Sequence, residues 1–449
     1  MVIIHYTLGL PPYRTGGLTK YSIDLATEEA KHNEVYILFP GRYTATRRTK
    51  INFYKSFKGI KCYEIYNPLP VSLTFGIKRP QNFMEKQSKE VFRQALLKLK
   101  PDVIHIHTLM GLHIEFLQIA KQMQIKLLYT THDYFGICPK VNLLDFDSKI
   151  CINYGDGKRC AECNKSAIST TKIKIMQGGI YRKFKDTSII KYIRNKQKKN
   201  IREEKKISLP IDINEERGKG YISLRNYYLS MLRIIGNIHY NSALSKKIYN
   251  QYIDIKGEII NISHADIKNN KKIRSYKDTE PLKLLFLAET EKYKGFDLLI
   301  DSLYRLVDNN NWILSVWGNT IEMDCGKISD RVIFNGRYKY EDLSKIFQEN
   351  DILVVPSIWP ETFGYTVLEA ISYAFPVIVT DNVGAKDIIQ DQKTGFIVSA
   401  NQKDISILIE KIINSRILLT HINKNIYENN DKNEFYNHYK AIIEYYNKI

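Results

Sequence analysis

The stretch DILVVPSIWPETFGYTVLEAISYAF, residues 351–375, decides the fold prediction because it reads as a strand, a loop and a helix in turn. Its short apolar run DILVVP is typical of a buried parallel strand. Pro360 and Gly364 disfavour a helix around Glu361, so we place Glu361 on the loop. The following YTVLEAISYAF has helical periodicity and carries Glu369. The two glutamates therefore flank a helix N-terminus, which is a favourable place for an anion such as a phosphate.

The same alternation of strands and helices extends along both halves of the chain. The apolar runs are VIIHYT, EVYILFP, DVIHIHT and IKLLYTTHD in the first half, and LKLLFLAE, WILSVWG, RVIFNG, DILVVPS, PVIVTDN and GFIVSA in the second. This pattern predicts an α/β protein with two doubly wound, Rossmann-like domains that face each other across a cleft. We assign residues 1–265 to the first domain, 266–280 to a linker, 281–430 to the second domain and 431–449 to a C-terminal helix. An insertion from about 138 to 235 interrupts the first domain.

Length and composition indicate an ordinary globular protein. The chain has 449 residues, of which 44% are hydrophobic and 26% are charged, as expected for two or three domains with their own cores. No run approaches the ~20 consecutive apolar residues of a membrane-spanning helix. The first residues lack the basic region of a signal peptide, so we expect a cytoplasmic protein.

The positive charge of the chain is concentrated in one segment. The formal net charge is +19, and the segment from Thr171 to Lys206 holds 13 Lys and Arg against 3 Asp and Glu. Apolar residues such as Ile180 and Phe184 lie between these charges. That mixture favours a peripheral contact with an anionic membrane over binding to nucleic acid. A solvated surface insertion is the simpler alternative.

In each predicted domain, one short motif follows the first strand. Gly16 and Gly17 lie between strand and helix, where small residues let backbone amides approach a phosphate. A flexible connection is the alternative, and no GxGxxG pattern supports a dinucleotide-dependent oxidoreductase. Lys294 and Gly295 hold the equivalent place in the second domain. There a lysine can neutralise a diphosphate, although a solvated lysine would look the same in the sequence.

Histidines end two of the predicted strands in the first domain. His107 ends DVIHIHT, and the carboxyl ends of parallel strands are where ligands bind in open α/β sheets. His105 alternates with His107, and we expect the two side chains to project differently around the sheet. His132 and Asp133 end the next strand in the same way. A purely structural role for these histidines is the alternative.

Four cysteines lie within 26 residues of the insertion and end in a Cys-x2-Cys pair: Cys138, Cys151, Cys160 and Cys163. A cytoplasmic location disfavours disulfides, whereas four thiolates suit a tetrahedral structural zinc. Reduced cysteines packed in a loop are the alternative. We expect no catalytic metal, because no Asp-x-Asp motif occurs in a donor-binding context.

Together these motifs resemble a family 4 retaining glycosyltransferase of the two-domain GT-B fold. The resemblance covers almost the whole chain and is weakest from about 140 to 235. Its most specific element is the Glu-x7-Glu motif, which Glu361 and Glu369 match with Phe363 and Gly364 between them. The insertion with its cysteines is similar to a branch of this family found in bacterial surface-polysaccharide synthesis. The further matches are Gly16, Gly17, His107, Lys294 and Gly295.

The resemblance implies a retaining transfer from a UDP- or GDP-linked sugar to a saccharide or polyprenyl-diphosphate-linked acceptor, with no nucleic acid as partner. Glu361 and His107 would lie at the catalytic centre, with Glu361 on the donor sugar and Glu369 on the ribose. The remaining donor contacts would come from Gly16, Gly17, Lys294, Phe363, Gly364, Tyr365 and Thr366.

The chain departs from the family at two positions. Glu289 stands where the family places a second diphosphate-binding arginine, and Phe375 replaces a small residue before a proline. Two other functions stay open at this point. One is a nucleotide-sugar epimerase of the same fold, and the other is a non-catalytic basic protein that binds membrane or nucleic acid.

Overall fold

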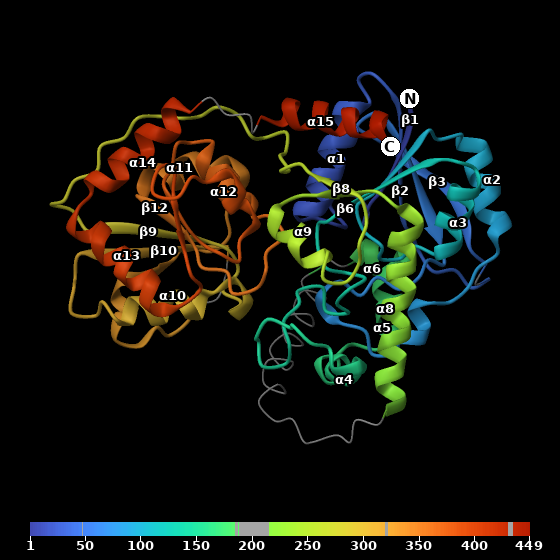
Figure 1. Ribbon diagram of the computed structural model, residues 1–449, viewed down its shortest axis with the longest axis horizontal. Helices are drawn as coiled ribbons and strands as arrows, with labels where there is room; N and C mark the ends of the chain where they lie inside the picture. Colours follow the sequence, from blue (N-terminus) through green and yellow to red (C-terminus); the bar gives the residue numbers. More distant parts are fainter. Residues whose placement is uncertain (47, 185–186, 188–214, 319–321, 430–433) are drawn as a thin grey trace.

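The chain forms two sheets side by side, each flanked by helices (Figure 1). The computed structural model describes residues 1–449 apart from residues 47, 185–186, 188–214, 319–321 and 430–433. The strand order is β3-β4-β2-β1-β5-β6-β7-β8 in the first sheet and β11-β10-β9-β12-β13-β14 in the second. Paired neighbours run parallel, except for β3 and β4. The prediction of two doubly wound, Rossmann-like domains is confirmed.

The strands of the first sheet are β1 (Val2–Tyr6), β2 (Glu34–Pro40), β3 (Lys50–Phe57), β4 (Ile60–Tyr66), β5 (Val103–Ile106), β6 (Lys126–Thr130), β7 (Ile238–Tyr240) and β8 (Gly257–Ile259). Those of the second are β9 (Leu282–Leu287), β10 (Trp312–Trp317), β11 (Val332–Phe334), β12 (Ile352–Val355), β13 (Val377–Thr380) and β14 (Phe396–Val398). The second sheet thus contains the six apolar runs that the sequence predicts as strands.

The helices that precede the second sheet are α1 (Gly17–Glu29), α2 (Lys89–Leu99), α3 (Ile114–Gln122), α4 (Lys158–Cys163), α5 (Thr170–Gln177), α6 (Gly179–Phe184), α8 (Glu215–Ile235) and α9 (Ala243–Tyr249). The later ones are α10 (Phe296–Tyr304), α11 (Leu343–Glu349), α12 (Tyr365–Ile371), α13 (Gln402–Asn414), α14 (Ile417–Glu428) and α15 (Phe435–Lys448).

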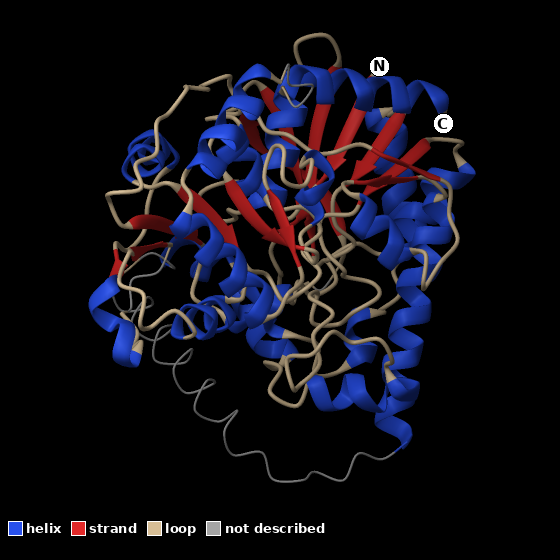
Figure 2. Cartoon of the chain, turned by 60° about the vertical axis from the view of Figure 1, so that its left-hand side comes forward, coloured by secondary structure: helices blue, strands red, loops and turns tan. Residues whose placement is uncertain are grey.

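The central strands are mostly apolar and buried because helices cover the sheets (Figure 2). All four residues of β13, for example, are buried. The helices in turn bury one face. In α13 the buried positions include Ile405, Ile409 and Ile412, which follow the helical period. Asn401 caps this helix by accepting a hydrogen bond from the Asp404 backbone N–H. Strand and helix patterns of this kind explain why the sequence predicts the architecture.

The C-terminal helix α15 returns to the first domain, beside α1 (Figure 1). The Tyr445 hydroxyl donates to the backbone oxygen of Ile238 at 3.1 Å, and Lys126 Nζ donates to the backbone oxygen of Tyr446 at 2.9 Å. These bonds join the end of the chain to β6 and β7. The last helix therefore ties both halves of the sequence together.

The predicted insertion lies at one end of the first domain and contains α4, α5, α6 and α8 (Figure 1). Helix α8 packs against α3 and α4. Of the basic segment from Thr171 to Lys206, the structure describes α5 and α6, and most of the remaining charges lie outside the described residues. Among the helices described here, none combines the length and the apolar character needed to cross a membrane.

Candidate active site

A cavity of about 320 Å³ lies where the two domains meet. The first domain contributes residues such as Gly17, His132 and Asn241, and the second contributes the loop after β12 and the start of α12. The carboxyl ends of parallel strands meet here, as expected for a ligand site in this kind of fold. The predicted donor-site residues that line the cavity are Gly17, Lys294, Glu361, Phe363, Gly364, Tyr365 and Thr366.

Glu361 and Lys294 form an ion pair in this cavity. The Lys294 Nζ atom lies 2.6 Å from Glu361 Oε1, and the Ser357 hydroxyl donates to Glu361 Oε2 at 2.7 Å. The backbone N–H of Glu361 donates to the Asn382 carbonyl at 2.8 Å, which fixes the loop against the segment that follows β13. The predicted loop position of Glu361 is therefore correct. The structure adds that the carboxylate pairs with the lysine predicted to meet the diphosphate.

Helix α12 begins at Tyr365, as the sequence predicts, and Gly364 precedes it with φ +114°. That backbone conformation favours glycine. The helix is shorter than predicted, because it ends at Ile371 instead of running to Phe375. Pro376 follows, and the residue before a proline is disfavoured in a helix.

Glu369 lies on α12 but is not among the residues that line the cavity. Its Oε1 atom is 3.4 Å from Nε2 of the buried His264. Among the residues that the structure describes, neither ring nitrogen of His264 has a hydrogen-bond partner. Burial raises the pKa of Tyr340, and the Glu369 carboxylate raises it further. Glu369 thus lies in a separate aromatic environment beside the cavity, and its ribose contact stays a prediction.

The Gly16–Gly17 loop approaches the second domain closely. Helix α1 begins at Gly17, and Gly16 caps it with φ +112°. A Cβ atom on Gly17 would lie 2.9 Å from Cε2 of Tyr365, which is closer than carbon atoms normally approach. A side chain at position 17 would therefore push the domains apart or displace the Tyr365 ring. The contact explains why a residue without a side chain is needed here.

The predicted catalytic residue His107 is fully buried and is not among the residues that line the cavity. His132, which ends the neighbouring strand, lines the cavity instead. The expectation that His105 and His107 project differently is wrong, because their ring centroids are 4.2 Å apart. Residues two apart on a strand share a face of the sheet. The same carboxyl-end rule that selected His107 applies to His132, so the sequence contained the signal.

Three buried hydrogen-bond donors in this cavity have no partner within the described part of the chain. They are the side-chain amide of Asn241, the indole N–H of Trp359 and the hydroxyl of Tyr365, and all three residues line the cavity. Buried polar groups are almost always hydrogen-bonded, so each unpaired one requires an explanation. A polar ligand with many acceptors, such as a sugar or a phosphate, would provide it. The sequence did not point to Asn241 or Trp359.

The two positions that depart from the family lie away from these donors. Glu289 is exposed, and neither it nor Phe375 is among the residues that line the cavity. Phe375 is fully buried and packs on Phe347, with ring centroids 4.8 Å apart. Its ring is therefore packed within the core of the second domain.

The four cysteines gather in the insertion without a disulfide. Burial raises the pKa of Cys160 to about 11 and that of Cys163 to about 12, with smaller effects from the other thiols. Arg225 donates to the Cys160 sulfur at 3.5 Å. Within the described residues, however, no three of these sulfurs lie within 4.8 Å of one another. The thiols are neighbours that would have to move closer to share a zinc ion.

Comparisons with known proteins agree with the fold. The model of the family "Glycosyl transferases group 1" matches residues 267–429, and that of "Glycosyltransferase Family 4" matches residues 15–149. A Klebsiella pneumoniae protein described as an uncharacterized 41.2 kDa protein in the cps region is 30% identical over 132 residues. That match covers 29% of this chain and 36% of the relative. The curated relatives are matched over 16% to 62% of their own lengths.

Two solved structures align with the whole chain or nearly so. The Anabaena protein Alr3699/HepE, in complex with UDP, gives a TM-score of 0.60 at 14% identity and covers 100% of both chains. WaaG, described as a glycosyltransferase involved in lipopolysaccharide biosynthesis, gives 0.54 at 14% identity and covers 99% of both. At such identities the similarity shows the fold alone. With a family model matched in each domain and this fold throughout, the chain belongs to the family 4 (group 1) glycosyltransferases of the GT-B type.

Proposed function

We propose that the chain transfers a sugar from a nucleotide diphosphate sugar, UDP- or GDP-linked, to a hydroxyl of a saccharide acceptor, with retained anomeric configuration. One observation carries this proposal. The unpaired donors of Asn241, Trp359 and Tyr365 line the same cavity as the Lys294–Glu361 ion pair. A ligand that combines sugar hydroxyls with phosphates satisfies both the unpaired donors and the cation.

Lys294 is the residue that meets the diphosphate. Negative charge grows on the leaving diphosphate as the bond to the sugar breaks, and a fixed cation stabilises that charge in the transition state. Its present partner Glu361 then turns to a sugar hydroxyl, because a carboxylate accepts hydrogen bonds from hydroxyls. The ion pair of 2.6 Å therefore opens when the donor binds.

The bond changes follow from retention. The acceptor hydroxyl attacks from the face that the diphosphate leaves, so the new carbon–oxygen bond forms on the side where the old one breaks. The proton of the acceptor hydroxyl passes to an oxygen of the departing diphosphate. No pair of carboxylates of the glycosidase type is required, because Glu369 does not line the cavity.

Product analysis tests this function. Purified protein is incubated with a panel of nucleotide sugars, with and without oligosaccharide acceptors, and the products are followed by NMR. We expect release of the nucleotide diphosphate that depends on the acceptor, and a glycoside with the anomeric configuration of the donor. A sugar that changes configuration without any acceptor would identify an epimerase and contradict the proposal.

A phosphate-bearing lipid, of the polyprenyl diphosphate kind, is the acceptor class that a second cavity favours. This cavity, of about 160 Å³, lies between the β1–α1 loop and α5. The guanidinium groups of Arg14 and Arg182 both stack on the Tyr13 ring, each 4.6 Å from its centroid. The Nε atom of Arg14 is buried and has no hydrogen-bond partner among the described residues. Apolar side chains complete the lining, among them Val71, Leu73, Phe75, Ile173 and Met176.

Changing Arg14 to glutamine is expected to raise KM for a lipid-diphosphate acceptor about tenfold, because one charge-assisted contact to a phosphate is lost. The same saccharide without lipid and phosphate should be used equally by wild type and variant. Arg233→Gln, on the exposed side of α8, is the control. Equal KM values of wild type and Arg14→Gln for the lipid acceptor would contradict this part of the proposal.

Peripheral membrane attachment through the basic segment is a further expectation, which rests on the sequence. Each Lys or Arg near an anionic surface contributes on the order of 1 kcal/mol. Co-sedimentation with vesicles of varied anionic-lipid content measures the binding. A variant with Lys196, Lys198, Lys199 and Arg202 changed to glutamine should bind less, and binding of both should weaken with salt. Equal sedimentation of the two proteins would mean that the basic segment is only a solvated surface insertion.

Structural zinc also stays a prediction. We expect about one equivalent of zinc in protein purified without added metal. Replacement of Cys160 and Cys163 by serine should remove it and lower the thermal stability of the insertion. Elemental analysis is the measurement. A metal-free wild type that is fully folded would mean that these thiols serve only as packed side chains.

A further inference from the structure

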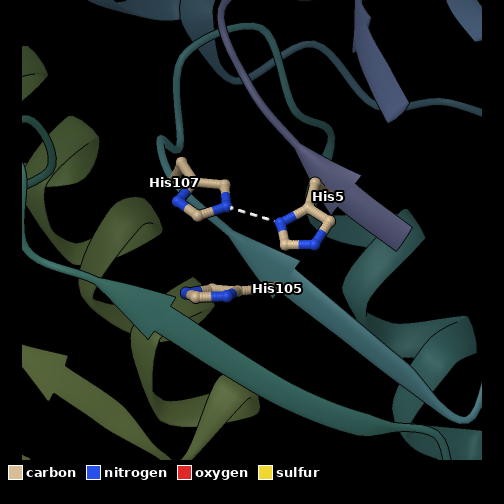
Figure 3. Close-up of side chains that lie close together, drawn as sticks. All are labelled: His5, His105 and His107. Carbon is tan, nitrogen blue, oxygen red and sulfur yellow. Dashed lines mark hydrogen bonds between the residues drawn. The ribbon is translucent and has the colours of Figure 1, made fainter. Parts of the chain in front are cut away.

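A chain of buried side chains runs from the cavity into the first sheet. Nε2 of His132, which lines the cavity, lies 3.3 Å from Nδ1 of His107. Nε2 of His107 lies 2.9 Å from Nδ1 of His5, as the dashed line in Figure 3 marks. Nε2 of His5 lies 2.7 Å from Oε2 of Glu29 on α1. Two histidines, His107 and His5, thus connect the cavity residue His132 to one carboxyl group.

The three groups beyond His132 are removed from solvent, whereas His132 itself is partly exposed. His5, Glu29 and His107 are fully buried. Burial lowers the pKa of His107 and of His132 well below the usual range, and neighbouring histidines lower both further. Both rings are therefore neutral at physiological pH. A neutral imidazole has one N–H donor and one acceptor nitrogen. Each ring therefore donates a hydrogen bond to one neighbour in the chain and accepts one from the other.

The hydrogen bond to Glu29 determines which nitrogen of each ring donates and which accepts. With the Glu29 oxygen beside it as the acceptor, a neutral His5 donates from Nε2 and keeps Nδ1 as an acceptor. His107 must then donate from Nε2 to His5 and accept at Nδ1. His132 in turn donates from Nε2 to His107. Nδ1 of His132 is left as an acceptor, and it has no partner among the described residues.

We infer that Glu29, acting through His5 and His107, fixes His132 as a neutral imidazole whose Nδ1 accepts a hydrogen bond from a hydroxyl bound in the cavity. Glu29, His5 and His107 are positioning residues, and only His132 touches the ligand. The identity of that hydroxyl rests on the proposed function. The proton arrangement does not, because it exists in the ligand-free protein.

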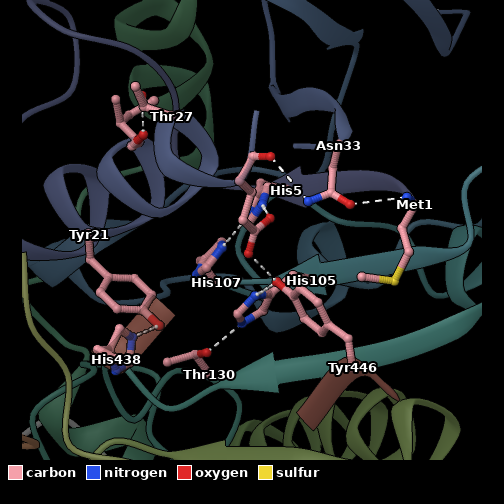
Figure 4. Close-up of polar contacts among 12 residues, drawn as sticks. Met1, His5, Tyr21, Thr27, Asn33, His105, His107, Thr130, His438 and Tyr446 are labelled. Carbon is pink, nitrogen blue, oxygen red and sulfur yellow. Dashed lines mark hydrogen bonds and ion pairs between the residues drawn. The ribbon is translucent and has the colours of Figure 1, made fainter. Parts of the chain in front are cut away.

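A second branch leaves the other oxygen of Glu29 and ends on a backbone carbonyl. Figure 4 shows its middle part, with Tyr446, His105 and Thr130. The branch has five hydrogen bonds of 2.6 to 3.0 Å. Five bonds require five protons, whereas the four neutral side chains between its ends supply four. The branch therefore needs one proton more than these side chains hold. Its members in order are Glu29, Tyr446, His105, Thr130, His239 and the backbone oxygen of Ile260.

This proton count makes glutamine the matched replacement for Glu29. The carboxamide oxygen accepts from His5 as the carboxylate does, and the amide N–H supplies the missing proton toward Tyr446. Leucine has a similar volume but can neither accept nor donate. The two variants therefore separate the hydrogen bonding of position 29 from its packing.

The remaining polar groups packed against the chain of histidines do not compete for His132. The Tyr21 hydroxyl lies 2.9 Å from Nε2 of His438 on α15 (Figure 4), and its ring presents an edge to His132 at a centroid distance of 4.8 Å. His438 donates from Nδ1 to the backbone oxygen of Asn261 at 3.0 Å. A metal ion is not needed either: nitrogens of His5, His105 and His107 lie within 4.8 Å of one another, but each has a hydrogen-bond partner.

Nitrogen-15 NMR of ligand-free protein labelled on histidine tests the inference directly. The His132 signals are assigned by their loss in His132→Gln. We expect the Nε2–H tautomer of His132 as a single neutral species. An Nδ1–H tautomer, or an imidazolium at neutral pH, in the wild-type protein would overturn the inference without any other variant.

The variants then connect the tautomer to Glu29. In Glu29→Leu we expect His132 to populate both tautomers and kcat/KM for the donor to fall about tenfold, as for one lost hydrogen bond. Glu29→Gln should keep both wild-type values. Glu28→Leu, one residue earlier on the outer face of α1, is the control, since Glu28 pairs with Lys31 at the surface. Tyr446→Phe breaks only the second branch and should leave His132 unchanged.

An unchanged His132 tautomer in Glu29→Leu would overturn the role of Glu29, whatever the activity. If Glu29→Leu does not fold, Glu29→Gln still decides, because an altered tautomer in that variant is incompatible with the hydrogen-bond directions given above. A correct tautomer in a protein without transferase activity would separate a failure of the proposed function from a failure of this inference.

Discussion

Replacing Lys294 with alanine is expected to lower kcat by about 10²–10³-fold while the protein remains folded. Lys294 is the one lysine or arginine among the residues that line the cavity in the described part of the chain. Removing a fixed charge that faces the leaving group costs about 2.7–4 kcal/mol of transition-state stabilisation. The change also leaves the half-buried Glu361 without its cation, beside an incoming diphosphate. Repulsion between the two should weaken donor binding as well.

Lys292→Ala is the control for this prediction. Lys292 lies on the same short turn, two residues earlier, but is exposed and does not line the cavity. Its removal should change kcat by less than about twofold, because exposed charges contribute little. Steady-state kinetics with saturating donor measure both variants. Equal kcat values for Lys292→Ala and Lys294→Ala would mean that the diphosphate does not bind at Lys294.

Glu361→Gln is expected to lower kcat by about 10²-fold with little change in the affinity for the free nucleotide. The amide keeps the size of the side chain, and the backbone bond of Glu361 to Asn382 is unaffected. What is lost is the negative charge that faces the sugar, where the transition state develops positive charge. Nucleotide affinity should be retained because we assign Glu361 to the sugar.

Glu369→Ala should give the opposite result, with weaker nucleotide binding and a smaller effect on kcat at saturation. Titration calorimetry with nucleotide diphosphates and steady-state kinetics separate the two. Equal loss of nucleotide affinity in both variants, with unchanged turnover at saturation, would contradict the division of roles. Loss in Glu361→Gln alone would mean that Glu369, outside the cavity, has no part in donor binding.

The local sequence was sufficient for most of the architecture. Runs such as ILVV and VIVT form β12 and β13 because only buried parallel strands are apolar without interruption. The start of α12 could also be predicted, since Gly364 precedes a helical pattern. The antiparallel hairpin of β3 and β4 was missed. Its strand KINFYKSF is largely exposed, so it lacks the continuous apolar signal of a central strand.

The candidate site was predictable only in part. Glu361, Lys294 and Gly17 carry local motifs, and all three line one cavity. The ion pair between Glu361 and Lys294 depends on how two separate loops meet, which no local pattern records. The choice of His132 over His107 likewise depends on depth within the sheet, because both end strands.

The buried histidine network was beyond local patterns for a related reason. His5 lies within the apolar run VIIHY and looks there like an isolated polar residue in a strand. Its partners Glu29 and His107 come from α1 and from the end of β5, 24 and 102 residues away along the chain. The pairing of β1 with β5 brings His107 to His5, and the packing of α1 beside the sheet brings Glu29. The hydrogen-bond directions follow once those distances are known.

Thermal unfolding with a panel of nucleotide diphosphates and nucleotide sugars tests the central claim most directly, namely that the cavity between the domains binds a nucleotide diphosphate sugar. A ligand present at 100 times its Kd stabilises the protein by about 2.7 kcal/mol. We predict that the diphosphate and the sugar conjugates of one base stabilise the wild type by this amount, and stabilise Lys294→Ala much less at the same concentrations. Failure of every nucleotide to stabilise the wild type, or equal stabilisation of both proteins, would contradict the account.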